Sequence, residues 1–287
     1  MKLSVIIPCY NAARTITIQL EALAQQSWEA PWEVIVSDNG SSDDTPTIVQ
    51  QYQCRWQALR WVDASDRRGP AHARNVGARV ALGEALAFVD ADDEVAPGWV
   101  AAIGNALGKY DFVASRFDIA KLNPPWVQRS HSSLQSKGLM HYNYPRYLPH
   151  ASGSGLGIKR ALHEAIGGFD DAFLYLQDTD YCWKAQRAGA QLYFAPEAVI
   201  HYRYRQTLRG LYQQARNYAE DNVLIYKKYR ALDMPPLTRY EIVRAWVQLF
   251  RRTIGMRSKG DFARWLWNVG WRVGRLHGSI KHRIWAP

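Results

Sequence analysis

LSVIIPCYN at residues 3–11 begins with a continuous apolar, β-branched run that ends at a proline and leads into polar residues. VIV at 34–36 and LAFV at 86–89 repeat the apolar run. Such runs are typical of strands that are buried on both faces of a parallel sheet. The segments between them that have helical spacing are roughly 13–25, 44–51 and 71–82. The alternation predicts an α/β fold with a mostly parallel open sheet and flanking helices.

The second half of the chain has a weaker pattern. Residues 119–150 are rich in Pro, Ser, His and aromatic residues without a sustained period, which predicts a long, partly mobile loop. The further elements that we expect are a short strand within 153–159, a helix start at 160–165, a turn at 167–170, a helix at 177–188, a strand at 191–195, and two or three helices from about 207. We predict a catalytic domain at 1–205 and a helical, basic and aromatic extension at 206–287.

Composition limits the class of protein. The net charge is +10, and residues 201–287 hold 18 Lys and Arg against 5 Asp and Glu, so the basic excess lies in the C-terminal segment. Three cysteines without CxxC spacing favour a reduced cytoplasmic compartment. The first apolar run is too short for a secretory signal, and no stretch approaches the roughly 18 apolar residues of a membrane span. We expect a soluble or peripheral protein.

The acidic cluster DADDE at 90–94 directly follows the apolar run at 86–89. Carboxylates this close raise one another's pKa unless a cation neutralises them. Oxygen ligands suit Mg²⁺ or Mn²⁺, which bind through one or two carboxylates and substrate phosphates. An acidic turn that caps a helix near Pro97 is the alternative.

Two further loops carry polar residues. Asp38 ends the strand at 34–36, where a carboxylate can accept hydrogen bonds from a base or ribose, although Ser and Asp there can equally cap a helix. RRGPAHARN at 67–75 opens a helix with guanidinium groups that attract phosphate, and Arg68 is our candidate. Simple solvation of surface arginines is the competing interpretation.

Asp178 follows the aromatic and apolar run FLYL at 173–176, which would desolvate it and raise its pKa toward that of a useful general base. Capping of the helix at 179–188 is the alternative for this residue. His201 follows Val199 and Ile200, and most histidines in such a position are structural rather than metal ligands.

The order of seven motifs resembles the family 2 glycosyltransferases, which have the GT-A fold. The matching pieces cover residues 3 to about 202 and are SVIIPCYN, VSDNGSSDDT, RGPAHARN, AFVDADD, GGFDDAF, QDTDYCWKAQRAGAQLYFAP and the histidine of VIHY. No single piece is decisive, but seven in the same order make coincidence very improbable. The resemblance implies an inverting transfer of one sugar from a nucleotide-diphosphate sugar to an acceptor hydroxyl.

The resemblance also implies roles for individual residues. Asp38 falls where the family contacts the nucleotide base, and Pro8, Tyr10 and Asn11 line the same pocket. The Asp-x-Asp pair implies that Asp90 and Asp92 bind Mn²⁺ or Mg²⁺ with the diphosphate, so that Asp90 also serves the nucleotide. The catalytic base corresponds to Asp178, and His201 matches a histidine that completes the metal site in several members.

Three departures from the family pattern stand out. Asn39 replaces the second acid of the usual Asp-Asp-Gly-Ser turn, which weakens the ribose assignment. Gln177 replaces the acid that commonly precedes the base, which would lower the pKa of Asp178 somewhat. No Gln-x-x-Arg-Trp motif of processive synthases follows the motif around Asp178, where Trp183 and Arg187 do not reproduce it, so a single addition is favoured over polymerisation.

The basic C-terminal segment leaves several partners open. Trp265, Trp267 and Trp271 beside Arg264, Arg272 and Arg275 predict an amphipathic helix on an anionic membrane surface, at the inner face of the cell membrane. Packing on the catalytic domain or in a homodimer is the alternative. Binding of nucleic acid is disfavoured because no module for it is recognisable.

The donor is a UDP-, GDP- or dTDP-linked sugar by resemblance, and the acceptor is a saccharide or a lipid-linked saccharide, in cell-surface polysaccharide or glycolipid synthesis. A nucleotidyltransferase on a similar fold is the nearest rival, but its Gly-rich activation loop is missing where Pro8 to Asn11 stand. A non-catalytic binding protein is a third option.

Overall fold

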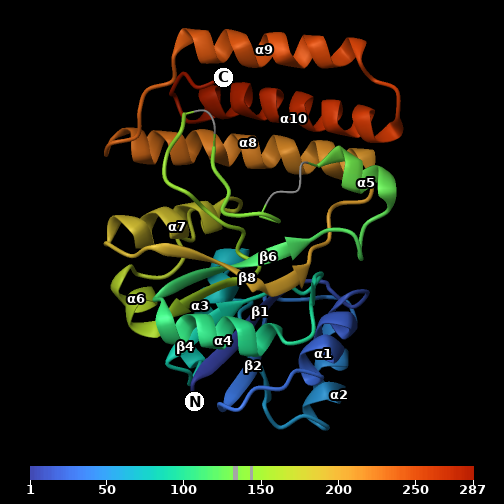
Figure 1. Cartoon of the computed structure of the whole chain (residues 1–287), viewed down its shortest axis with the longest axis vertical. Helices are drawn as coiled ribbons and strands as arrows, with labels where there is room; N and C mark the ends of the chain where they lie inside the picture. The colour runs from blue at the N-terminus through green and yellow to red at the C-terminus, as the bar shows by residue number, and fades with distance from the viewer. Residues whose placement is uncertain (132–134, 143–144) are drawn as a thin grey trace. The chain divides into compact units, whose positions relative to one another are not determined.

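The computed structural model describes residues 1–131, 135–142 and 145–287 (Figure 1). The chain forms two compact units that interleave along the sequence. The first comprises Met1–Asp118, Gln135–Met140 and His150–Tyr202, and the second comprises Ile119–Leu134, His141–Pro149 and Arg203–Pro287. The predicted domain boundary at 205/206 stays a prediction.

The first unit is built on one sheet with strand order β3-β2-β1-β4-β7-β6-β8-β5 among the described residues. The strands are β1 (Leu3–Cys9), β2 (Trp32–Asp38), β3 (Leu59–Asp63), β4 (Ala85–Phe88), β5 (Glu94–Val95), β6 (Phe112–Asp118), β7 (Leu156–Lys159) and β8 (Leu192–His201). The pairings among β1 to β4 and between β6 and β8 are parallel, and β7 runs antiparallel to both neighbours. The β5–β8 pairing is also antiparallel.

Helices flank this sheet on the connections between strands. They are α1 (Ile16–Ala24), α2 (Thr45–Gln53), α3 (Pro70–Val80), α4 (Trp99–Lys109), α6 (Arg160–Ala165) and α7 (Gln177–Arg187). Trp99, Ile103 and Leu107 recur every four residues along α4, so the helix buries them in the main core. Gly77 lets α3 lie close to β1, because a Cβ there would be 2.5 Å from a methyl of Ile6.

The predicted α/β fold with a mostly parallel open sheet is confirmed, and so are the strands expected at 3–7, 34–36 and 86–89. The sequence pattern missed β3 and β6. In β3 only Leu59 is buried, and β6 contains Ser115 and Arg116, so neither shows the continuous apolar run that revealed the others. The two-residue β5 is too short for any periodicity.

The second unit contains three long helices, α8 (Leu208–Arg230), α9 (Arg239–Ile254) and α10 (Lys259–Lys281). Each begins at a hydroxyl cap: Thr207, Thr238 and Ser258 accept hydrogen bonds from backbone N–H groups three residues later. Figure 1 shows α10 between α8 and α9. Among the described residues, no helix combines the length and apolar character needed to cross a bilayer.

Glycines bring α8 and α10 together. Gly270, Gly274 and Gly278 recur every four residues, and a Cβ at Gly274 would be 2.1 Å from the carbonyl oxygen of Arg216. Gly270 faces Tyr212 and Gly278 faces Glu220, so the two helices run parallel at backbone contact distance. A side chain at any of the three glycines would push the helices apart.

The sequence interpretation of 119–150 as one loop is wrong where α5 (Pro125–Ser130) forms. This six-residue helix is too short for a visible period, and it packs where Gly260 of α10 leaves room beside Arg129. Lys259 also lies over the ring of Trp126, 4.2 Å from its centroid. Residues 132–134 and 143–144 of the predicted loop lie outside the described residues.

Two of the α10 residues that the sequence analysis assigned to a membrane surface, Trp267 and Arg275, pack within the second unit instead. Trp267 packs on His131 and Tyr218, with ring centroids 5.2 and 6.3 Å away. Arg275 is 1% exposed and donates a hydrogen bond to Asn222 of α8. The sequence could not show this, because the covered face of a helix depends on its neighbours.

Candidate active site

The predicted nucleotide residues converge at the carboxyl ends of β1 and β2. Pro8 and Cys9 pair in register with Ser37 and Asp38, so the loops that follow the two strands start side by side. Asp38 is buried and accepts a hydrogen bond from the Ser41 hydroxyl at 2.5 Å.

Asn11 and Tyr10 extend this group. Asn11 adopts a left-handed backbone (φ 49°), and its side-chain oxygen accepts from the Ser42 N–H at 2.8 Å. The half-exposed ring of Tyr10 lies under the Arg68 guanidinium, 5.6 Å from ring centroid to Cζ. A flat aromatic ring, a cation and a buried carboxylate therefore lie at one edge of the sheet, and this combination suits the base and the phosphates of a nucleotide.

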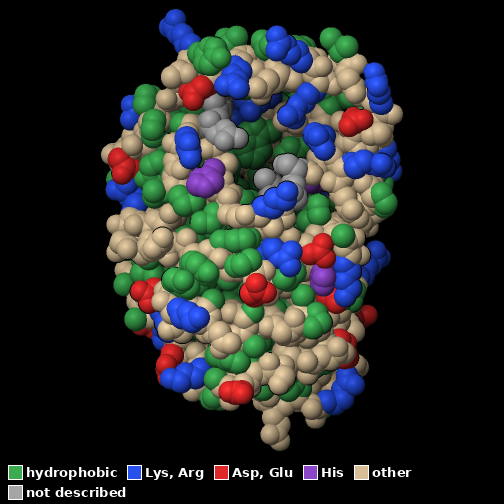
Figure 2. Space-filling model, in the orientation of Figure 1, with side chains coloured by type: hydrophobic (Ala, Val, Ile, Leu, Met, Phe, Trp, Pro, Cys, Tyr) green, Lys and Arg blue, Asp and Glu red, His purple; other side chains and the backbone are tan. Residues whose placement is uncertain are grey.

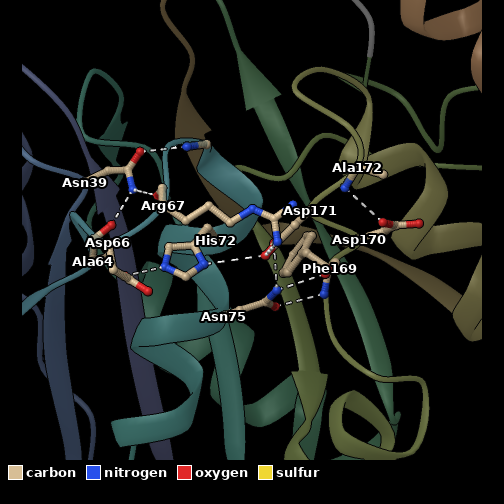
Figure 3. A network of polar contacts seen from close by, with 11 residues as sticks. Asn39, Ala64, Asp66, Arg67, His72, Asn75, Phe169, Asp170, Asp171 and Ala172 are labelled. Carbon is tan, nitrogen blue, oxygen red and sulfur yellow. Dashed lines mark hydrogen bonds and ion pairs between the residues drawn. The ribbon is translucent and has the colours of Figure 1, made fainter.

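Asn39 holds the neighbouring loop (Figure 3). Its amide nitrogen donates to the carbonyl oxygens of Ala64 and Arg67 at 2.6 and 2.8 Å, and its oxygen accepts from the Gly69 N–H at 2.8 Å. An aspartate has no donor for those two carbonyls. The departure from the family turn therefore has a structural reason: Asn39 fixes the segment that carries Arg68 and starts α3.

The acidic cluster lies where β4 ends. Asp90, Asp92 and Asp93 each offer an oxygen, and these oxygens lie within 4.8 Å of one another. Ser154 orders the turn: its hydroxyl donates to Asp93 at 2.6 Å and accepts from the Asp90 N–H at 3.2 Å. All three donors are hard carboxylate oxygens, which fit Mg²⁺ or Mn²⁺. Glu94, the fourth acid of the motif, belongs to β5 instead.

Arg74 connects this cluster to the predicted base. Its side chain is 3% exposed, and Nη2 donates to Asp90 at 2.5 Å. Its guanidinium lies over the Phe169 ring, 5.5 Å from the centroid, and against Gly153, where an added Cβ would be 2.8 Å from Nη2. Nε and Nη1 have no hydrogen-bond partner among the described residues. A buried cation with unused donors beside carboxylates is a local source of positive potential.

Asp178 stands in the first turn of α7. Its two oxygens accept hydrogen bonds from the N–H groups of Gly153 at 2.9 Å and Thr179 at 2.8 Å. Burial raises the pKa of Asp178, while the Gly153 hydrogen bond and the Arg74 charge lower it and the Asp90 charge raises it. The net rise agrees with the direction expected from the apolar run before α7. Such a carboxylate is a stronger base than an exposed one.

A polar network fixes the turn before α7 (Figure 3). The Asn75 amide donates to the carbonyl of Phe169 and accepts from its N–H, both at 2.9 Å. Asp171 accepts from Asn75 at 3.2 Å and from Arg67 at 3.1 Å, and its carboxylate lies 3.5 Å from Nδ1 of His72. The start of α3 is thereby tied to the turn that leads to Asp178.

His201 ends β8, opposite Glu94 in the β5–β8 pairing. Its Nδ1 lies 2.7 Å from a carboxylate oxygen of Asp118. A carboxylate on one ring nitrogen orients the ring and leaves the other nitrogen as the candidate ligand. His201 is not part of the three-aspartate group, so its role as a metal ligand stays a prediction.

Sequence reasoning placed the strand-end residues together but overlooked the groups that join them. Arg74, Gly153 and Ser154 contact the candidate residues directly, yet they lie far from them in sequence. The small-residue stretch GSG at 153–155 and the arginine of ARN at 73–75 are visible in the sequence. That they contact the candidate residues becomes apparent only from the fold, in which β7 pairs with β4.

The fold and this set of loops define a GT-A type of α/β protein. The mannosyltransferase PcManGT from Pyrobaculum calidifontis, solved in complex with GDP-Man and Mn²⁺, has a similar fold with a TM-score of 0.65. The two chains are 20% identical, and the match covers 96% of this chain and 87% of the other.

Matches to sequence models identify a family as well as a fold. The sequence model described as glycosyl transferase family 2 matches residues 4–167, and that of glycosyl transferase family group 2 matches 86–282. The chain therefore belongs to glycosyl transferase family 2, as the resemblance predicted.

Two relatives show the range of the similarity. Glycosyltransferase AglE of Haloferax volcanii is 27% identical over 199 residues, which cover 68% of this chain and 65% of AglE. GalNAc(5)-diNAcBac-PP-undecaprenol beta-1,3-glucosyltransferase of Campylobacter jejuni is 35% identical over 98 residues, which cover 34% of this chain and 31% of that enzyme. The chain spans less than two thirds of the length of either relative.

Proposed function

We propose that the protein transfers one sugar from a nucleoside-diphosphate sugar to an acceptor hydroxyl, with inversion at the anomeric carbon. One observation carries this proposal. The carboxylate cluster after β4 and the carboxylate of Asp178 are joined through Arg74 and Gly153, so the groups that we propose as metal site and base lie close to each other. Family membership supports the class of reaction.

In this proposal the donor nucleotide lies along the carboxyl ends of β1 and β2. Asp38 accepts hydrogen bonds from the base, while Pro8, Tyr10 and Asn11 form the wall of the pocket. Arg68 reaches the phosphates from the start of α3, where the backbone N–H groups also favour an anion. The side-chain contact between Tyr10 and Arg68 supports one continuous pocket.

Asp90 and Asp92 would hold Mn²⁺ or Mg²⁺, with Asp93 adjacent and His201 as the further candidate ligand. The three carboxylates fit such an ion because they supply hard oxygen donors within reach of one centre. When bound, the ion neutralises charge on the departing diphosphate. Arg74 holds Asp90 in place and adds positive potential of its own to this edge of the site.

Asp178 would take the proton from the acceptor hydroxyl as that oxygen attacks the anomeric carbon. A single displacement opposite the leaving group inverts the configuration there. The hydrogen bonds from Gly153 and Thr179 orient the carboxylate, and the network at Asn75 and Phe169 fixes the turn before it. Positioning of this kind is a large part of the rate enhancement in bimolecular transfers.

The donor and acceptor are proposed by class. The solved neighbour holds GDP-Man, and the donor here is a UDP-, GDP- or dTDP-linked sugar. The Campylobacter relative is named for an undecaprenol-diphosphate acceptor, which supports a saccharide or lipid-linked acceptor at the inner face of the cell membrane. We place the reaction in cell-surface polysaccharide or glycolipid synthesis, with 1–205 as the catalytic domain.

The proposal is tested by incubating the full chain with a panel of UDP-, GDP- and dTDP-sugars and saccharide acceptors. The expected products are a nucleoside diphosphate and a glycoside whose anomeric configuration, measured by NMR, is opposite to that of the donor. Retained configuration would exclude a single displacement. Release of pyrophosphate from a nucleoside triphosphate and a sugar phosphate would instead identify the rival nucleotidyltransferase.

A further inference from the structure

Helix α9 carries an apolar stripe that faces away from the rest of its unit. Its inner side buries Leu249 and partly covers Ile242 and Trp246. On the other side, apolar residues recur at spacings of three and four, which places them on one face. Their exposed fractions are Tyr240 71%, Val243 60%, Val247 41%, Phe250 67% and Ile254 91%.

Isolated exposed apolar residues are normal on a protein surface, but a contiguous row of five is typical of an interaction site. The helix has two apolar faces, of which packing against α10 uses only one. The row is continuous along the whole length of α9, from its first turn to its last.

Cations border the stripe. At 100° per residue, Arg244 and Arg251 lie along one side of it and Arg239 along the other, and all three are exposed. Glu241 is the one acidic residue of α9, and it is engaged in the capping box with Thr238. Green hydrophobic and blue basic side chains accordingly gather along α9 at the top of Figure 2. An apolar row between arginines matches a surface with an apolar interior and anionic groups above it.

More apolar residues are exposed at the end of the unit where α9 begins. Lys227 near the end of α8 donates to the carbonyl of His282, just past α10, so these helix ends come together. Leu232 after α8, and Ile280 and Trp285 at the end of α10, are all exposed there. The basic residues Lys281 and Arg283 accompany them.

We propose that α9 docks on an anionic phospholipid membrane, with the stripe from Tyr240 to Ile254 in the headgroup and acyl boundary and its arginines on lipid phosphates. Helices of this composition lie in the plane of the interface. Tyr240 suits the level of the headgroups. The tryptophans of α10, by contrast, are partly buried and have partners within the unit: Trp267 packs on His131 and Tyr218, Trp265 donates to Thr253, and Trp271 lies beside Tyr142.

A second copy of the chain fits this surface less well. A two-fold contact pairs the same patch with itself, so the arginine rows of two α9 helices would face each other. Like charges that close oppose association, whereas an anionic bilayer attracts the same arginines by about fivefold in affinity per charge. Charge complementarity therefore favours the membrane.

The test is co-sedimentation of the full chain with phosphatidylcholine vesicles and with vesicles that contain phosphatidylglycerol, without donor or acceptor, so the result does not depend on the transferase proposal. We expect binding to the anionic vesicles, weaker binding at high salt, and little binding to neutral ones. F250S/I254S should weaken it by roughly tenfold or more. R244Q/R251Q should weaken it by roughly fivefold per arginine.

Leu82→Ser is the matched control, because Leu82 is 63% exposed but belongs to the first unit, and it should leave vesicle binding unchanged. Unaltered circular dichroism and thermal midpoints show that the variants fold. Equal vesicle binding by F250S/I254S and the wild type would overturn the proposal. A dimer in light scattering that F250S/I254S dissociates would assign the stripe to a second copy, and binding to oligonucleotides but not vesicles would assign it to nucleic acid.

Discussion

The two units use arginine and aromatic residues in different ways. In the first unit Arg74 is buried between Asp90 and the ring of Phe169, and the surrounding polar groups converge on the ends of strands. In the second unit α9 keeps Arg244, Arg251 and the ring of Phe250 on its surface. The difference teaches that burial and partners, not residue type, distinguish an arginine held in the candidate active site from arginines left on a surface.

The largest expected effect is on the base. Asp178→Asn keeps the shape of the side chain but removes its ability to take a proton, so turnover should fall by about 10²-fold or more. Asp44→Asn, at an exposed position without a capping hydrogen bond, is the control. Steady-state rates of nucleoside diphosphate release measure both. Wild-type turnover in Asp178→Asn would remove this residue from the reaction.

The pH dependence of wild-type activity also tests the role of Asp178 as the base. Because burial raises the pKa of Asp178, the carboxylate forms only above the usual range of an aspartate, near 4. Activity should therefore fall as the pH drops through that raised pKa, and the loss should begin at a higher pH than for an exposed aspartate. An acid limb near 4 in kcat/KM would contradict a desolvated base.

Arg74→Met should have the next largest effect. The substitution leaves Asp90 without its cation. The free energy of unfolding should fall by about 3 kcal/mol, the lower end of the range for buried pairs, because Asp90 is partly exposed. The substitution also removes a charge that lowers the pKa of Asp178, so the acid limb of kcat/KM should move to higher pH. Arg74→Lys should restore part of the stability and part of the wild-type acid limb. Arg79→Met, on the exposed side of α3, is the control. An unmoved acid limb would show that Arg74 is only structural.

Asn39→Asp should destabilise the first unit by about 2 kcal/mol, because a carboxylate cannot donate to the carbonyls of Ala64 and Arg67. The deficit should grow as the pH rises and the new carboxyl ionises. Denaturant unfolding at two pH values measures it, with Gln51→Glu at an exposed position as the comparison. A fully stable Asn39→Asp protein would mean that the loop does not need the amide.

Gly274→Ala tests the second unit and should have the smallest effect: it should lower the free energy of unfolding by about 1 to 2 kcal/mol. A methyl group there meets the carbonyl of Arg216, so α8 and α10 must separate. Gly255→Ala, where an added Cβ meets nothing within 4 Å, is the matched control. Equal thermal midpoints for the two variants would contradict the close contact of the helices.

The sequence predicted those elements of the fold and those candidate site residues that depend on the pattern of neighbouring residues. Buried strands leave continuous apolar runs, and the polar residues after them lie at one sheet edge by the rule for parallel sheets, which is why Asp38 and Asp90 were found. Asp178 was found from its motif and from the apolar run before it. Their roles in binding and catalysis stay predictions.

What the sequence could not provide is contact between distant segments. Arg74 gains its meaning from Asp90 and Gly153, and the orientation of α9 and α10 depends on which helix face the neighbours cover. Both helices have basic and aromatic residues, so composition alone favoured the tryptophans of α10. The exposed fractions, not the composition, show that the apolar row of α9 lies on the surface.

The most direct test of the central claim is calorimetric titration of UDP, GDP and dTDP into the wild type and Asp92→Asn, with Mn²⁺ and with chelator. The account predicts that one nucleotide binds the wild type tightly only when Mn²⁺ is present, and that Asp92→Asn loses most of this gain while thermal unfolding shows it intact. Equal nucleotide affinity with Mn²⁺ and with chelator, or an undiminished gain in Asp92→Asn, would contradict it.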